Sequence, residues 1–320
     1  MRIHVLALDG VFDTGLATVL DAFQTANELA EMSSLASPRF DVTIVGVRKT
    51  VKTSQGLTVP VAAVLTRIIP DWVVVPAIGF KMPGPLQTAL ARSDVSDAGK
   101  TLRSWADRGA ATAAACIGTF VLAESGLLDH QDSTTTWWLA PLFRQRYPKV
   151  RLDESRMIVK SGKFVTAGAA LSHMDLALWI IRQKSPRLAA LTAKYLVVDS
   201  RPSQSAYILA DHLAHSDAMV ERFERWARSR LTQGFSLHDA ATAARSSKRT
   251  LARRMQAVMG KSPLSYFQEL RVERAVHLLK TTHESVDEIA ARVGYADGVT
   301  LRTLLRRRLG HGVREIRNSL

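Results

Sequence analysis

The chain has 320 residues, of which 47% are hydrophobic, and its 43 Lys and Arg against 29 Asp and Glu give a formal net charge of +14. No apolar run approaches the roughly 18 residues of a membrane span, and residues 1–8 lack the layout of a signal peptide, so we expect a cytoplasmic protein without membrane contact. The single cysteine excludes an internal disulfide, and because no Cys and His residues have zinc-ligand spacing we expect neither a metal nor a cofactor.

The first part of the chain alternates apolar strands with amphipathic helices, which is typical of a parallel sheet covered by helices. Strands are expected at 3–8, 40–45, 72–75 and 110–115, and helices at 16–29, 95–108, 171–183 and 186–198. Two short runs at 157–160 and 163–166, joined by Ser161 and Gly162, predict a hairpin at one side of the sheet. We therefore expect residues 1–198 to form an α/β domain with a doubly wound, mostly parallel sheet of the flavodoxin-like class.

Cys116 lies where a strand of small residues runs into a helix, and Gly118 permits close approach, as in a nucleophile elbow. Such a turn exposes the side chain at the carboxyl edge of the sheet, where a helix N-terminus lowers the pKa of a thiol. Because open α/β sheets bind small molecules at this edge, we expect an effector site there. Its candidate residues are the carboxylate Asp13, the backbone of Ala77, Cys116, Ile117 and the ring of Trp137, beside Trp138.

Plainer interpretations of the same residues stay open. Cys116 could be a small buried hydrophobe, and Trp137 and Trp138 could be anchors of the core. Asp13 could simply cap the first helix.

With Cys116-Ile117-Gly118 and the runs 126–129 and 135–138, residues 1–198 resemble the ThiJ/PfpI-like domain of the class I glutamine amidotransferase superfamily. The resemblance implies that an enzyme would carry a His directly after the cysteine or at position 137. Ile117 and Trp137 stand there and neither accepts a proton, so we expect no catalytic residue and no enzyme activity. The other side chains that could serve a thiol are His130, His173, Asp13 and Asp21.

Residues 199–216 are expected to form a linker, because the run 199–205 is polar and contains a proline. Residues 217–320 predict an all-α domain with two repeated segments, 236–260 and 285–310, each a short helix, a tight turn and an Arg-rich second helix. The inward-facing residues of the second helices are expected to be Leu251 and Met255 in the first segment, and Leu301, Leu304 and Leu305 in the second.

The outward-facing residues of these second helices are the candidates for DNA contact. They are Lys248, Arg249 and Arg253 in the first segment and Val299, Arg302, Thr303 and Arg306 in the second. Arg249 and Arg253 are expected to read base edges. The second helix is expected to begin at Thr300, with Gly298 also outward, so its tip offers few hydrogen-bonding groups. We expect it to specify fewer bases and to rely on Arg306, Arg307 and Arg308 for backbone contacts.

Residues 221–320 carry 20 Lys and Arg against 10 Asp and Glu, a net charge of +10, as a phosphate-binding surface requires. The runs 247–255, 260–263, 289–290 and 293–295 make this part of the chain resemble the AraC/XylS family DNA-binding domain. The resemblance implies two subdomains joined by a long helix at 263–280, each placing one helix in the major groove. The family usually has an aromatic residue where Met255 and Leu305 lie and a proline where Val313 lies, and these apolar exchanges alter packing.

We therefore expect a sequence-specific DNA-binding regulator of transcription, with a domain order similar to that of the GlxA-like regulators. Its expected partners are double-stranded DNA, a small-molecule effector, a second copy bound through residues 1–198, and RNA polymerase as a further candidate. Three alternatives stay open for residues 1–198. They are a Cys-dependent amidohydrolase or hydratase with a base beside Cys116, a redox sensor using Cys116, and a plain dimerisation module in which side chains fill the Cys116 edge.

Overall fold

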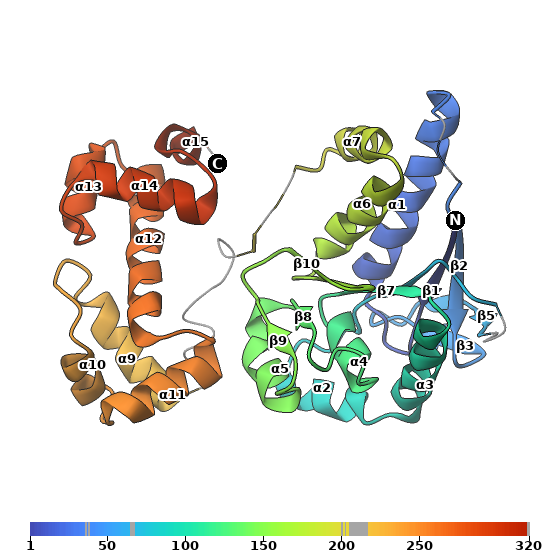
Figure 1. The fold of residues 1–320 in the computed structure, drawn as a ribbon, viewed down its shortest axis with the longest axis horizontal. Coiled ribbons are helices and arrows are strands. Elements are labelled where there is room, and N and C mark those ends of the chain that lie inside the picture. The colour runs from blue at the N-terminus through green and yellow to red at the C-terminus, as the bar shows by residue number, and fades with distance from the viewer. Residues whose placement is uncertain are drawn as a thin grey trace. The chain divides into compact units, whose positions relative to one another are not determined.

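The computed structural model describes residues 1–318 except 36, 38, 65–67, 200, 202 and 205–216. The chain divides into two compact units, Met1–Ser205 and Ala206–Leu320 (Figure 1). No helix in the described part is long and apolar enough to cross a membrane. Most of the linker expected at 199–216 falls outside the described residues, so its bounds stay a prediction.

The first unit is built on a seven-stranded sheet with the order β10-β11-β7-β6-β1-β2-β5. All neighbouring strands are parallel except β10 and β11, which form the hairpin expected at one side of the sheet. The strands are β1 Arg2–Leu6, β2 Asp41–Gly46, β5 Ala62–Ala63, β6 Trp72–Val75, β7 Ala111–Ala115, β10 Ile158–Ser161 and β11 Phe164–Ala167. The mostly parallel sheet confirms the expected fold class.

Helices cover both faces of this sheet (Figure 1). Alternate residues of one strand therefore face opposite cores: Val74 packs with the α1, α6 and α7 side, and Val75 with the α2, α3 and α4 side. The first group is α1 Asp13–Met32, α6 Ser172–Lys184 and α7 Pro186–Tyr195, and the second is α2 Pro83–Leu90, α3 Ser93–Asp107 and α4 Gly118–Glu124. This two-sided cover is why the strands are apolar throughout and not alternating.

Several short elements of this unit were not expected from the sequence. They are α2, α5 Ala140–Arg146, the 3-10 turn Trp137–Leu139, the edge strand β5, and two small sheets formed by β3 Thr50–Lys52 with β4 Thr58–Pro60 and by β8 Asp132–Ser133 with β9 Arg151–Leu152. Three expected elements are shorter than predicted: β1 ends at Leu6, β7 begins at Ala111 and α7 ends at Tyr195.

The second unit is all-α in its described residues and contains two helix-turn-helix pairs joined by a long helix (Figure 1). The first pair is α10 and α11, the second is α13 and α14, and α12 connects them, as expected. The helices are α9 Ala218–Arg228, α10 Leu237–Ala243, α11 Lys248–Met259, α12 Pro263–Thr281, α13 Val286–Arg292, α14 Gly298–Leu309 and α15 Val313–Asn318.

Side-chain caps fix where these helices begin. Ser247 accepts from the Thr250 N–H at the start of α11, and Ser285 forms a full capping box with Glu288 at the start of α13. Gly260 and Gly310 end α11 and α14 in the left-handed conformation, with φ of 66° and 76°. The residues that depart from the family pattern keep their packing roles, because Met255 and Leu305 are fully buried.

Candidate functional site

The first pair presents a basic outer face on α11. Leu251 and Met255 are buried, so the helical period places Lys248, Arg249 and Arg253 on the side of α11 that faces solvent. These three side chains are exposed, and within the part of the chain that the structure describes none of them forms a hydrogen bond or an ion pair. They are therefore available to phosphates and base edges, as expected for a helix that enters the major groove.

One exposed polar residue of α11 escaped the sequence reasoning. Gln256 lies one turn beyond Ala252 and Arg253, and its side chain is also exposed. Glutamine can bond an adenine through two atoms at once, so Gln256 extends the candidate surface toward the C-terminal end of α11. The helical spacing from Arg249 through Arg253 to Gln256 could have shown this.

Arg254 has a different role, although it stands in the same basic run. Its Nε donates to the carboxylate of Asp217, which also accepts from the Met219 and Val220 N–H groups at the start of α9. Burial raises the pKa of Asp217, but the backbone N–H donors and Arg254 outweigh it and lower the pKa overall. Arg254 therefore ties α11 to α9.

The second pair presents Arg302, Thr303 and Arg306 on α14, all exposed as expected. Val299 is 66% exposed at the tip of the helix. The Thr303 hydroxyl donates to the Val299 carbonyl at 3.0 Å, which leaves its oxygen as an acceptor. The surface of α14 thus combines two arginines with an apolar side chain near its N-terminal end.

The beginning of α14 differs from the expectation. The helix starts at Gly298, two residues early, because Asp297 caps it by accepting from the Thr300 N–H at 2.7 Å. Gly298 is not outward but buried, since Asp287 of α13 accepts from its N–H at 2.8 Å and leaves no room for a side chain. Two carboxylates therefore lie at the tip of α14, where α11 has the neutral Ser247.

The expected backbone role of Arg308 is also corrected. Arg308 is half-buried and its Nη1 lies 3.4 Å from Oε1 of Glu269 on α12. The other oxygen of Glu269 accepts from Lys261 at 2.7 Å. Arg306 and Arg307 stay exposed, so they remain available to the DNA backbone.

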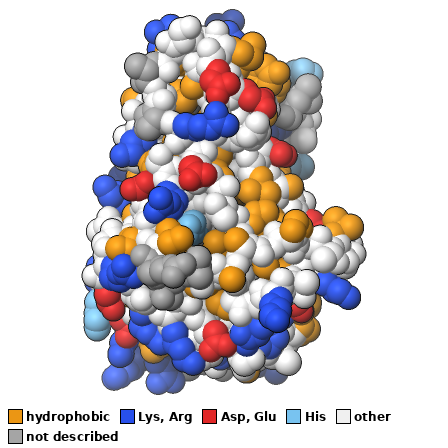
Figure 2. Space-filling model, turned by 90° about the vertical axis from the view of Figure 1, so that its right-hand side faces the viewer, with side chains coloured by type: hydrophobic (Ala, Val, Ile, Leu, Met, Phe, Trp, Pro, Cys, Tyr) orange, Lys and Arg blue, Asp and Glu red, His pale blue; other side chains and the backbone are white. Residues whose placement is uncertain are grey.

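The charge distribution favours the helical unit as the polyanion-binding part. Residues 1–220 hold the other 23 basic and 19 acidic residues of the chain, a nearly balanced composition. Figure 2 shows a face on which basic and acidic side chains are interspersed, with hydrophobic ones between them. The net charge of +10 over residues 221–320 is thus the main excess of the molecule.

Cys116 lies on the elbow between β7 and α4 with a φ of 56°, so the expected turn is present. Gly118 makes it possible, because a Cβ there would lie 2.2 Å from the Val75 carbonyl oxygen. The side chain is not exposed as expected, since only 3% of Cys116 is accessible. Burial raises the pKa of the thiol to about 12, the opposite of the expected lowering, so the thiol is protonated at neutral pH.

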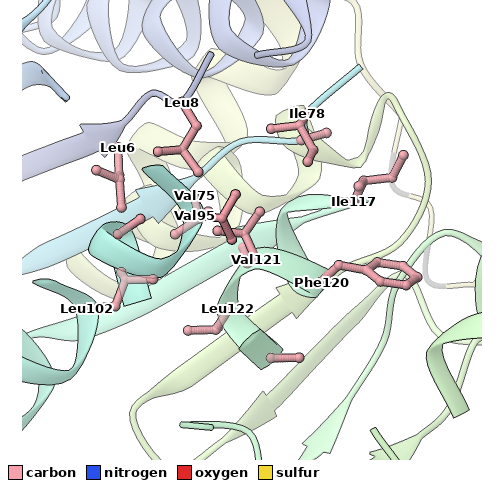
Figure 3. Close-up of a cluster of buried hydrophobic side chains, with 14 of the residues drawn as sticks. Leu6, Leu8, Val75, Ile78, Val95, Leu102, Ile117, Phe120, Val121 and Leu122 are labelled. Carbon is pink, nitrogen blue, oxygen red and sulfur yellow. The ribbon is translucent and has the colours of Figure 1, made fainter. Parts of the chain in front are cut away.

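The edge around Cys116 is closed by buried side chains, most of them apolar, and the Thr135 hydroxyl donates to the Cys116 carbonyl at 2.8 Å. Cys116, Ile117, Ala77 and Ile78 belong to one buried cluster, and Figure 3 shows Ile117 and Ile78 within it, near Phe120 and Val121. Trp137 is 9% exposed and meets Trp138 edge to face at 5.5 Å. An effector at the predicted residues therefore requires these side chains to move apart.

His173 lies beside this edge but is already fully bonded. Its Nε2 accepts from the Ala77 N–H at 3.1 Å, and its Nδ1 lies 2.6 Å from the Ala170 carbonyl oxygen. Burial lowers the pKa of His173 to about 4, so the ring is neutral at pH 7. Both ring nitrogens and the Ala77 amide are thus engaged with each other or the backbone, and neither group is free to act on a substrate or ligand.

The other candidates for a base point elsewhere. Asp13 is the first residue of α1 and not its cap; its Oδ2 accepts from the Ser54 hydroxyl at 2.7 Å and the Gln55 N–H at 3.2 Å. Asp21 and His130 are exposed, on α1 and in a loop. The described residues contain no cluster of His, Cys, Asp and Glu that could hold a metal ion.

Comparisons with known proteins agree with both units. Residues 1–183 match the DJ-1/PfpI family and residues 240–319 match a helix-turn-helix domain. The HTH-type transcriptional regulator GbdR of Pseudomonas aeruginosa is 25% identical over 198 residues, which is 61% of this chain and 54% of GbdR. The HTH-type transcriptional regulator ArgR of Pseudomonas aeruginosa is 26% identical over 225 residues, 69% of this chain and 68% of ArgR. The chain thus spans about half the length of GbdR.

Solved structures show the same fold for the first unit. An AraC family transcriptional regulator from Pseudomonas putida aligns with a TM-score of 0.51 and 18% identity, over 61% of this chain and 98% of that chain. A putative transcriptional regulator protein from Vibrio parahaemolyticus aligns with a TM-score of 0.51 and 19% identity, over 61% and 98%. At these identities the likeness concerns the fold alone.

Proposed function

Because the chain belongs to the DJ-1/PfpI family and carries an AraC-type helix-turn-helix domain, we propose that it is a DNA-binding regulator of transcription. One observation carries this proposal. The helices α11 and α14 are both capped, and each buries one apolar face while its arginines are exposed. The long helix α12 connects the two helix-turn-helix pairs to which they belong. Such a pair of helices fits successive major-groove segments of duplex DNA.

Base reading by α11 can be tested with substitutions in the full chain. Arg249→Ala and Arg253→Ala should each cost about 1–3 kcal/mol of binding free energy and relax the base preference at particular positions. The matched control is Arg274→Ala, an exposed arginine of α12 outside α11 and α14. If the two variants weaken binding equally on all sequences, as a phosphate contact would, α11 does not read bases through these residues.

We propose that the α/β unit is not an enzyme. The protonated, buried Cys116 has no free base beside it. Both ring nitrogens of His173 are engaged by the backbone of Ala77 and Ala170. The two positions where an enzyme of this kind would carry a histidine hold Ile117 and Trp137. The competing proposal is a Cys-dependent amidohydrolase or hydratase. Turnover of an amide, isonitrile or aldehyde substrate by the purified protein, abolished in Cys116→Ser, would establish that activity and overturn ours.

We propose that the α/β unit regulates the DNA-binding unit by forming a homodimer. The closed packing at Cys116 favours this dimerisation module over an effector pocket at Asp13, Ala77, Cys116, Ile117 and Trp137. Exposed apolar residues of this unit are candidates for the contact: Leu171 directly before α6, Tyr195 at the end of α7 and Val197 just after it. Light scattering should give the mass of two chains, and a single-chain mass would contradict the proposal. A cytoplasmic location and contact with RNA polymerase are proposals that follow from the same function.

A further inference from the structure

The two helix-turn-helix pairs have separate hydrophobic cores on one connecting helix. The N-terminal half of α12 packs on the side of the first pair, where Tyr266 contacts Phe223 of α9 and Phe267 contacts Phe235 in the loop before α10. The C-terminal half packs with the second pair, where Leu278 and Leu279 share a cluster with Ile289, Leu301 and Leu305. The angle between α11 and α14 therefore depends on what joins the two halves besides the backbone of α12.

Arg271 lies at the boundary between these two cores. Its Nε donates to the Leu231 carbonyl at 2.8 Å and its Nη2 to the Gln233 carbonyl at 2.6 Å, both in the loop between α9 and α10. The same guanidinium lies 4.7 Å from the ring centre of Phe267 and 5.4 Å from that of Tyr295. One side chain thus contacts the loop that leads into the first pair and the turn of the second.

Gly294 lets the turn of the second pair approach this loop. Its φ of 81° is left-handed, and a Cβ at this position would lie 2.3 Å from the Leu231 carbonyl oxygen and 2.4 Å from Nη2 of Arg271. The contact is therefore close-packed as well as hydrogen-bonded. Substitution of Gly294 would push the turn and the loop apart.

Glu269 forms a second connection, two residues earlier on α12. It binds Lys261, just after the C-terminal end of α11, and Arg308, near the C-terminal end of α14. A single carboxylate therefore links the ends of the two helices that present the basic surface. Glu269 and Arg271 lie on the same helix two residues apart, so they act at the same boundary.

We propose that Arg271 and Glu269 are positioning residues that hold the two readers, α11 and α14, in a fixed relative orientation. This orientation sets the spacing along the DNA between two blocks, the groups of base pairs that the two helices recognise. The inference rests on the proposed DNA-binding function. A rigid link between two readers gives each a high effective concentration at its own block, but only at the spacing that matches the link. A loosened link accepts several spacings and binds each of them more weakly.

The test is selection of duplexes from a randomised pool by the purified full chain, followed by affinity measurements. Wild type should select two base blocks at one fixed spacing. Arg271→Met should select the same blocks at several spacings and bind the wild-type duplex about tenfold more weakly. Its affinity for a duplex with the second block scrambled should match that of wild type. Arg274→Met is the matched control on α12 and should behave as wild type.

Two further, more conservative variants separate a change in the selected spacing from a loss of folding. Arg271→Lys retains the positive charge but cannot donate to both loop carbonyls at once, so it should select several spacings to a smaller degree. Glu269→Gln weakens the contacts with Lys261 and Arg308 and should also widen the range of selected spacings. If the variants keep one spacing and the wild-type affinity, or lose affinity for the scrambled duplex to the same extent, the inference is wrong. Failure of the wild type to select any blocks would instead contradict the proposed function itself.

Discussion

Protonation of His173 should destabilise the α/β unit below neutral pH. The neutral ring accepts the Ala77 N–H at Nε2, and a protonated ring would place two N–H groups against each other in a site without water contact. Burial lowers the pKa of His173 from 6.5 to about 4 in the folded chain, so the folded state binds this proton less readily than the unfolded state does.

The size and the pH range of this effect follow from the two pKa values. Each unit of difference corresponds to about 1.4 kcal/mol, so His173 accounts for about 3 kcal/mol of the free energy of unfolding at high pH. This stability is fully present above pH 6.5, declines as the pH falls, and is lost once the pH drops through the folded value of about 4. The sign is that of a group whose pKa is depressed by folding.

The assay is urea unfolding at a series of pH values, followed by tryptophan fluorescence, since five of the six tryptophans lie in the α/β unit. His173→Gln keeps an acceptor for the Ala77 N–H but cannot be protonated. The difference between wild type and variant isolates His173 from the carboxylates that also titrate. A difference that stays constant between pH 7 and pH 4 would refute the reasoning, because it would mean that the folded ring accepts the proton freely.

Three other outcomes follow from the two units. Cys116→Ser should leave DNA affinity unchanged. The thiol of the folded chain should react with iodoacetamide far more slowly than that of the unfolded chain, because burial raises its pKa to about 12. Peroxide-dependent DNA binding that is lost in Cys116→Ser would instead reveal a redox sensor. Selection from randomised DNA should show fewer specified bases under α14 than under α11, since Val299 and two capping carboxylates occupy the tip of α14; equal information in both blocks refutes this. Arg254→Ala should lower the stability of the helical unit by about 1 kcal/mol or less, measured by denaturant unfolding, because Asp217 loses its ion-pair partner but keeps the Met219 and Val220 N–H donors; a changed base preference would place Arg254 in the groove.

Elements with a strong local pattern were predictable from the sequence. The strand at Trp72–Val75 was expected within its exact bounds, because four apolar residues between breakers leave little alternative. Ser247 and Gly260 bound α11 through contacts within one turn of the helix, and signals of this kind are visible in the sequence. The exposure of Lys248, Arg249 and Arg253 followed from the helical period.

Features that depend on distant partners could not be predicted in the same way. The burial of Gly298 at the start of α14 depends on Asp287, which lies eleven residues earlier in the chain and accepts from the Gly298 N–H. The burial of Cys116 depends on its packing in one cluster with Ala77 and Ile78, which are distant in the sequence, whereas the prediction considered only the nearby helix terminus. The role of Arg271 depends on the Leu231 carbonyl, forty residues away in the chain. In each case the deciding contact is tertiary.

The central claim, that the chain binds duplex DNA through α11 and α14, is tested most directly by the salt dependence of affinity. The exposed basic residues Lys248, Arg249, Arg253, Arg302, Arg306 and Arg307 would release counterions from the phosphates they contact. If Arg249 and Arg253 read bases and the other four contact phosphate, the logarithm of the association constant of the full chain should fall with the logarithm of salt concentration at a slope of about −4. Absent binding, or an affinity that does not change with salt, would contradict the account.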